Sequence, residues 1–242
     1  MHPFIVLPIA LATCGATMVG GLFAIGLRDR IHLILGFSAG AVIGVAFFDL
    51  MPEAIETARA VDPREMLGIM ALGFFFYVLL DRLVALHGHD SQPGQRQRRG
   101  AIGATSLSLH SFMDGFAIGV AFQASQSVGF VVAAAVLVHD FSDGLNTVNV
   151  VIKNGAGRGT AFGWLLVDAL APVLGASASL VISLSQNSVA VFLAIFSGFF
   201  LYIGASDLLP ESHQAHPRFF TTLATFAGAG SLFVVTRLAG SA

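Results

Sequence analysis

The stretch HSFMDG, residues 110–115, decides how the rest of the sequence is interpreted, and it recurs as HDFSDG at residues 139–144. Each copy places a histidine and an aspartate four residues apart, so both side chains face the same side of a helix. Each copy also lies inside an apolar stretch long enough to cross a bilayer, where ionisable side chains are costly and mark functional sites. The two copies therefore predict a shared site for one divalent cation.

The composition is that of a membrane protein. Of the 242 residues, 55% are hydrophobic and only 11% are charged, and the mean hydropathy is +0.81. Ordinary soluble domains are about 25% charged. Because the apolar excess is spread along the whole sequence, we predict a single all-α polytopic membrane domain over residues 1–242. The net charge of −2 and the dispersed basic residues argue against a nucleic-acid partner.

Eight apolar segments each approach the roughly 20 residues needed to cross about 30 Å of hydrocarbon. They are residues 4–27, 31–50, 66–86, 101–122, 128–152, 160–182, 189–209 and 219–238. Residues 87–100, HGHDSQPGQRQRRG, are expected to form a cytoplasmic loop of disordered character. We thus predict eight transmembrane helices in an integral protein of the bacterial inner (plasma) membrane.

The basic residues predict the orientation. With both termini outside, nine lysines and arginines flank the spans on the inner side and three on the outer side, which satisfies the positive-inside rule. The outer three are Arg59, Arg64 and Arg237.

A second repeat predicts internal symmetry. FFDLMPEA (residues 47–54) ends the second span and IGASDLLPES (residues 203–212) ends the seventh. In the predicted topology these two spans run in opposite directions, as an inverted repeat requires. Spans one to three would then be related to spans six to eight around a central pair, a 3+2+3 arrangement. We expect the prolines to break the helices there and to let water reach Asp49, Glu53, Asp207 and Glu211.

The metal hypothesis rests on four side chains, His110, Asp114, His139 and Asp143. Two imidazoles and two carboxylates suit zinc, and also iron(II), manganese or cobalt, because these donors select weakly among borderline cations. The alternative is a buried polar network that only fixes helix packing. Several desolvated acids would destabilise such a network unless a cation were present, so we favour the metal site.

Three further residues are candidates for a second, weaker site. Ser111 and Asp140 each follow a histidine of the motif and point about 100° further round the helix. Asp168 lies in the sixth span, in GWLLVDALAP, where Pro172 is expected to kink the helix. Asp168 is either a contributor to this site or a hydrogen-bonded structural acid.

At this point the sequence resembles the ZIP (Zrt/Irt-like) family of divalent-metal transporters. The resemblance covers nearly the whole chain and rests on GFSAGAVIGVAFFDLMPEAIE, HSFMDG, HDFSDG and GFFLYIGASDLLPE. It implies eight spans with both ends outside, a binuclear metal site, homodimers and alternating access of an elevator type. Against the family pattern, Asp114 and Asp143 replace glutamates, Ser111 replaces an asparagine, and Met113 and Ser142 replace prolines. The shorter acids require a closer helix approach or a metal held through water.

The predicted function is transport of zinc, with iron, manganese or cobalt as alternatives, toward the cytoplasm. The ion is the substrate, no prosthetic group is expected, and the protein is not an enzyme. Proton competition at the ligands should weaken metal binding as the pH falls. The competing class is an intramembrane zinc-dependent hydrolase with a fixed metal. A site with as many acids as imidazoles suits an exchangeable ion better. A receptor or storage protein that binds without transport is the third possibility.

Overall fold

The computed structural model describes residues 3–26, 31–58, 61–86, 93–213 and 219–239. Every regular element in these ranges is a helix. In chain order they are α1 (Pro3–Gly26), α2 (Ile31–Val45), η1 (Ala46–Leu50), α3 (Met51–Thr57), α4 (Pro63–Leu86), α5 (Pro93–Ala124), α6 (Gln126–Lys153), α7 (Arg158–Val181), α8 (Gln186–Tyr202), η2 (Ile203–Leu208), α9 (Leu209–His213) and α10 (Phe219–Ala239).

Seven helical rods are long and apolar enough to cross a membrane, so the all-helical polytopic prediction is confirmed at this level. They cover residues 4–24, 35–57, 63–83, 126–153, 158–181, 186–206 and 219–237. The exception is α5, whose 32 residues include HSFMDG. The polar side chains in and around this motif lower the mean hydropathy of α5, because serine, histidine and aspartate interrupt its apolar run.

Part of the predicted cytoplasmic loop is helical, which corrects the expectation for residues 87–100. Residues 93–100 form the first two turns of α5, and residues 87–92 lie outside the described ranges. Proline is favoured in the first turn of a helix, where its missing N–H costs nothing, and glutamine and arginine are good helix formers. Pro93 followed by GQRQRR therefore starts a helix.

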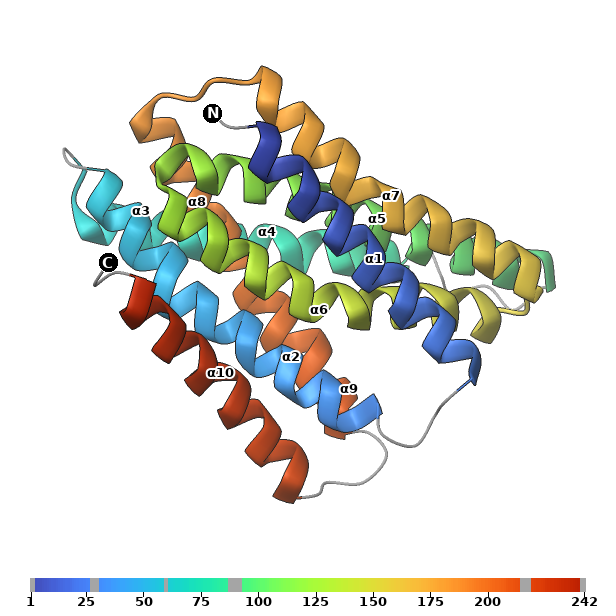
Figure 1. The fold of residues 1–242 in the computed structure, drawn as a ribbon. Coiled ribbons are helices and arrows are strands. Elements are labelled where there is room, and N and C mark those ends of the chain that lie inside the picture. The colour runs from blue at the N-terminus through green and yellow to red at the C-terminus, as the bar shows by residue number, and fades with distance from the viewer. Residues whose placement is uncertain (1–2, 27–30, 59–60, 87–92, 214–218, 240–242) are drawn as a thin grey trace.

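The helices pack in two groups (Figure 1). In the first, the α5–α6 group, α1 packs along α6 and α7, and α5 packs along α6 and α7. In the second, the α2–α8 group, α2 packs along α10 and α4 packs along α8, with α3, η1, η2 and α9 continuing the α2 and α8 rods. The first turn of α1 and the last turn of α10 lie at the same end of the molecule (Figure 1).

Glycines bring helices of the α5–α6 group into backbone contact. A Cβ on Gly144 would collide with the carbonyl of Thr17 on α1, and a Cβ on Gly115 would collide with the carbonyl of Pro172 on α7. Small residues permit this close approach in membrane bundles. Gly115 and Gly144 are the last residues of the two motif copies, so each motif carries its own contact with a neighbouring helix.

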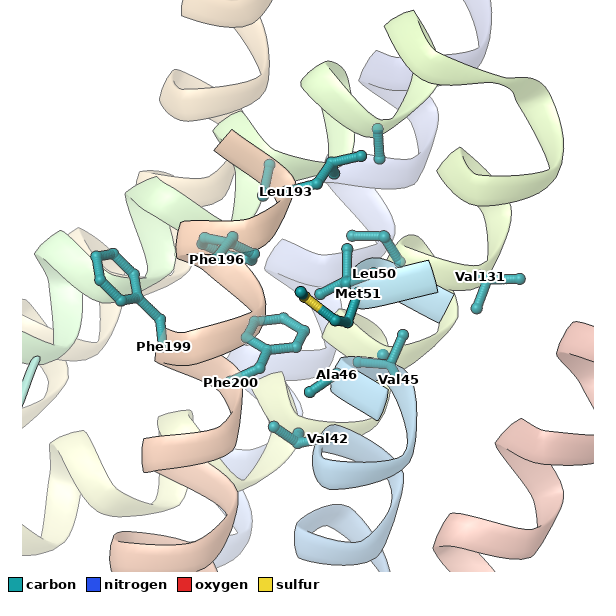
Figure 2. Close-up of a cluster of buried hydrophobic side chains, with 14 of the residues drawn as sticks. Val42, Val45, Ala46, Leu50, Met51, Val131, Leu193, Phe196, Phe199 and Phe200 are labelled. Carbon is teal, nitrogen blue, oxygen red and sulfur yellow. The ribbon is translucent and has the colours of Figure 1, made fainter. Parts of the chain in front are cut away.

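Large apolar side chains pack α8 against the α2–η1 rod inside the α2–α8 group. Figure 2 shows Phe200 projecting from α8 toward Val42 and Ala46 of the α2–η1 rod, and Phe196 and Leu50 belong to the same core. All five side chains are buried. This core also includes residues of α5 and α6, so it lies against the helices that carry the motifs.

The prolines of the second repeat do not break their helices, contrary to expectation. In each copy a π-helical turn, η1 or η2, precedes the proline and the rod continues beyond it. The N–H of Met51 bonds to the carbonyl of Ala46, and that of Leu209 to the carbonyl of Gly204, both five residues back. Widening the turn shifts the hydrogen-bond register next to a residue that has no N–H to donate. Pro172 lies inside α7, which continues to Val181, and the kink predicted there stays a prediction.

Candidate metal centre

The four predicted ligands converge. His110 and Asp114 project from α5, His139 and Asp143 project from α6, and all four side chains are buried. One ligand atom from each can be chosen so that all lie within 4.8 Å of one another. The single helix turn between the members of each pair sets this geometry, because residues four apart lie above one another on the same face.

Asp114 is at the centre of this cluster. Its Oδ2 lies 3.1 Å from His110 Nε2 on the same helix and 3.2 Å from His139 Nε2 on the neighbouring helix. Asp143 Oδ2 lies 3.6 Å from the first of these nitrogens and 3.8 Å from the second. The shortened acid at position 114 therefore still spans the gap between α5 and α6.

The tautomer of His139 follows from its backbone contact. Its Nδ1 lies 2.9 Å from the carbonyl oxygen of Ala135, which can only accept, so Nδ1 carries the proton. In the neutral ring, the lone pair of Nε2 then points toward the carboxylates. In metal-binding histidines, one ring nitrogen usually donates a hydrogen bond in this way, which orients the ring and leaves the other nitrogen to bind the metal.

Aromatic rings of the other helix group cover both imidazoles. Phe200 on α8 stands nearly perpendicular to His139, with ring centroids 5.3 Å apart, and Tyr77 on α4 stands nearly perpendicular to His110 at 6.2 Å. From the sequence alone, the aromatic run from Phe74 to Tyr77 indicates lipid or helix packing. That holds for the exposed Phe75, but the sequence gives no signal that Tyr77 reaches the site.

Asp168 and Ser111 lie together, as the second-site hypothesis requires. Ser111 donates to one carboxylate oxygen of Asp168 and Thr147 on α6 donates to the other, each at 2.8 Å. The two hydrogen bonds agree with Asp168 as a structural acid, and its contact with Ser111 of the first motif agrees with a place in a second site. Both interpretations therefore stay open. Sequence reasoning missed Thr147, although its polarity within an apolar helix was the available signal.

Asp140 has a different environment. It is fully buried, and one of its oxygens lies 3.9 Å from His139 Nε2. Neither carboxylate oxygen accepts a hydrogen bond from any residue within the described ranges. An orphaned buried carboxylate is unfavourable unless a cation or proton accompanies it, so this side chain fits the edge of a cation site.

The acids of the second repeat lie apart from this cluster or outside the described side chains. Glu53, together with Glu56, Thr57 and Gln123, lines a cavity of about 300 Å³ at the α3 end of the bundle. Asp49, one turn before Glu53, has a buried oxygen that lacks a hydrogen-bond partner within the described ranges. The side chains of Asp207 and Glu211 lie outside the described part of the structure.

Replacing Thr147 by valine should destabilise the protein, because it removes one of the two donors to a buried carboxylate. We expect a loss of about 1–3 kcal/mol in the free energy of unfolding, typical of an orphaned buried polar atom. Thermal melting of the purified protein in detergent measures it. Thr147→Ser retains the hydroxyl and should melt near the wild type; equal melting of the valine variant would contradict the role of this bond.

Residues 85–236, more than half of the chain, match the sequence profile of the family described as ZIP Zinc transporter. The chain belongs to the ZIP zinc transporter family. The resemblance found from the motifs is therefore confirmed. ZIP proteins are transporters and not enzymes, so the hydrolase alternative is set aside, and zinc is their transported substrate rather than a prosthetic group.

Individual ZIP relatives align over most of this chain. The zinc transporter ZupT of Corynebacterium aurimucosum is 26% identical over 222 residues, covering 82% of this chain and 83% of the relative. ZupT of Salmonella paratyphi A is 25% identical over 225 residues, covering 86% and 87%. Zinc transporter ZIP13 of Pongo abelii is 22% identical over 224 residues; the alignment covers 87% of this chain but 65% of that longer protein.

Proposed function

We propose that the protein carries zinc across the membrane through the site formed by His110, Asp114, His139 and Asp143. The observation that carries this proposal is the convergence of four buried donor atoms from two helices within 4.8 Å. The printed names of the ZupT and ZIP13 relatives support zinc as the cargo. Iron(II), manganese and cobalt remain candidate substrates because the donor set discriminates weakly among them.

We further propose that α5 is an eighth span, with both termini outside. The packing of α5 along α6 and α7 supports this, since both neighbours are long and apolar enough to cross a bilayer. The first turn of α1 and the last turn of α10 lie at the same end of the molecule (Figure 1), which supports an even number of spans. With nine basic residues on the inner side and three on the outer side, this topology puts the site within the membrane and the 87–100 segment on the cytoplasmic side.

The packing pattern supports an inverted repeat. Exchanging spans one to three with six to eight, and four with five, maps the α1–α6 pair onto α7–α5 and the α2–α10 pair onto α8–α4. All four pairs pack closely. The π-helical turns before Pro52 and Pro210 occupy equivalent positions in the two halves. Such repeats with a site at their interface are a transporter architecture.

Alternating access would move the α5–α6 group against the α2–α8 group, in the manner of an elevator. The site belongs to the first group and the aromatic rings that cover it belong to the second. Asp140, Ser111 and Asp168 would form a second, weaker cation position next to the first. We propose inward transport, a homodimer and the bacterial inner membrane from the family resemblance and from the bacterial ZupT relatives.

Uptake into proteoliposomes that contain a zinc-sensing dye tests the proposal. The wild type should accumulate zinc down its gradient at both of two tested pH values, with slower uptake at the lower pH because protons compete for the ligands. Iron(II), manganese and cobalt added as competitors rank the alternative substrates. Zero flux with retained stoichiometric binding would contradict transport and would identify a binding or storage protein.

A further inference from the structure

The ring of His110 is braced by a residue that the metal hypothesis does not use. Tyr77 on α4 stands at 88° to the imidazole with ring centroids 6.2 Å apart. Perpendicular aromatic pairs at this separation are attractive, because the edge of one ring meets the face of the other. The contact crosses from the α2–α8 group to the α5–α6 group and ends on a ligand of the proposed site.

Aromatic side chains of α8 pack against Tyr77. Its ring lies 5.1 Å from that of Tyr202 and 5.4 Å from that of Phe199. The Tyr202 hydroxyl donates to Oδ2 of Asp81 at 3.0 Å. Asp81 lies one helix turn after Tyr77 on α4, so both side chains face α8. Tyr202 contacts both of them, Asp81 through its hydroxyl and Tyr77 through its ring.

The two histidines of the site are oriented by different means. His139 has the hydrogen bond from Nδ1 to the carbonyl of Ala135. For His110, the structure records the two carboxylates at 3.1 and 3.6 Å, the ring of His139 at 5.7 Å and the ring of Tyr77. The carboxylates are co-ligands that would reorganise around an ion. Within the described part of the chain, the Tyr77 ring is thus a support of His110 that comes from outside the cluster of proposed ligands.

We propose that Tyr77 is a positioning residue that orients the His110 imidazole for metal binding, and that Tyr202 and Asp81 hold Tyr77 in place. The inference rests on the proposed metal site. Groups that orient a metal ligand without touching the metal typically contribute 10–100-fold to affinity. Because a ring contact is weaker than a hydrogen bond to the ligand, we expect a change at the lower end of that range.

Cobalt(II) binding to the purified protein in detergent tests the proposal. Cobalt(II) can occupy zinc-type sites, and its visible absorption depends on the ligands and their geometry. We expect Tyr77→Leu to weaken cobalt binding about tenfold and to change the absorption spectrum toward that of His110→Ala. Tyr202→Leu, which removes the support behind Tyr77 without touching His110, should shift both in the same direction by less.

Two matched variants separate positioning from general packing. Tyr77→Phe retains the ring and should restore the wild-type spectrum. Phe75→Leu makes a similar loss at an exposed position two residues away on α4 and should leave the spectrum unchanged. Thermal melting of each variant accompanies the titration, and Tyr77→Met, which retains volume without an aromatic ring, replaces Tyr77→Leu if the latter does not fold.

The outcomes distinguish this inference from the function on which it rests. If His110→Ala leaves cobalt binding unchanged, the proposed site is wrong. If His110→Ala abolishes the spectrum while Tyr77→Leu binds cobalt as the wild type does, only the positioning role is wrong. A Tyr77→Phe variant that behaves like Tyr77→Leu would also overturn the proposal, because it would assign the effect to the hydroxyl rather than to the ring.

Discussion

An Asp114→Ala, Asp143→Ala double variant is expected to lose zinc uptake, with at least a roughly 100-fold fall in zinc affinity. Asp114 Oδ2 lies within 3.2 Å of both histidine nitrogens, so its removal takes away the oxygen that joins the two helices' ligands. Losing Asp143 as well leaves only two imidazoles. Groups that only orient a metal ligand typically contribute 10–100-fold to affinity, so the loss of two ligands themselves should lower the affinity by more. Isothermal titration and proteoliposome uptake measure the two effects.

The matched control for this experiment is Asp62→Ala, an exposed acid that precedes α4 and bonds the backbone N–H of Arg64. It removes a carboxylate without touching the ligand cluster and should transport normally. Normal uptake by the double variant would instead show that the ion takes another route. Binding retained at full stoichiometry in that variant would transfer the primary site to Asp140 and Asp168.

Gly144→Ala is expected to destabilise the protein although it adds a single methyl group. That methyl would collide with the backbone of Thr17 and approach the backbone N of Gly21, so α1 and α6 must separate. Overpacking of this kind costs about 1–3 kcal/mol. Because Asp143 is the preceding residue, the displaced α6 should also weaken zinc binding. Thermal melting with and without zinc measures both consequences.

Gly163→Ala on α7 provides the control, since a Cβ there meets nothing within 4 Å. It should melt at or above the wild-type temperature, because alanine favours helix over glycine by roughly 1 kcal/mol. Equal melting of the Gly144 and Gly163 variants would contradict the close backbone contact at α1.

The cluster of two histidines and two aspartates was predictable because helical periodicity and the cost of burying charge act along one segment. A histidine and an acid four residues apart must share a face, and two such pairs in apolar segments need a reason to be buried. His110, Asp114, His139 and Asp143 accordingly lie together. Their positions next to the motif histidines identified Ser111 and Asp140, and its place inside an apolar span identified Asp168, but all three only as candidates, since the distance between different helices depends on their packing.

Contacts between helices distant in sequence were not predictable. Thr147 and Tyr77 carry polarity or aromaticity, but nothing in their own segments specifies that they meet Asp168 and His110. The same limit applies to Ser142, which stands where the family has proline. It donates to Ser38 on α2, and Ser38 donates to the carbonyl of Val138, a link between the two groups that needs both partners to be known.

The prediction that Pro52 and Pro210 break their helices was wrong for a different reason. A proline removes one donor, and the usual consequence in water is a helix end, because solvent can satisfy the freed carbonyl. Within an apolar bundle the backbone must be satisfied internally, which favours a widened turn over an interruption. The π-helical turns before Pro52 and Pro210 follow this rule.

If the proposed site binds an ion, the rings that cover its two imidazoles would link that binding thermodynamically to the relative position of the helix groups. Tyr77 and Phe200 belong to one group, and the histidines they contact belong to the other. If the rings raise the affinity of the site tenfold, then by reciprocity a bound ion favours this relative position of the groups by about 1.4 kcal/mol. Sliding the groups apart would lower the affinity at the same moment, so the ion would dissociate more readily on the side to which it had been carried.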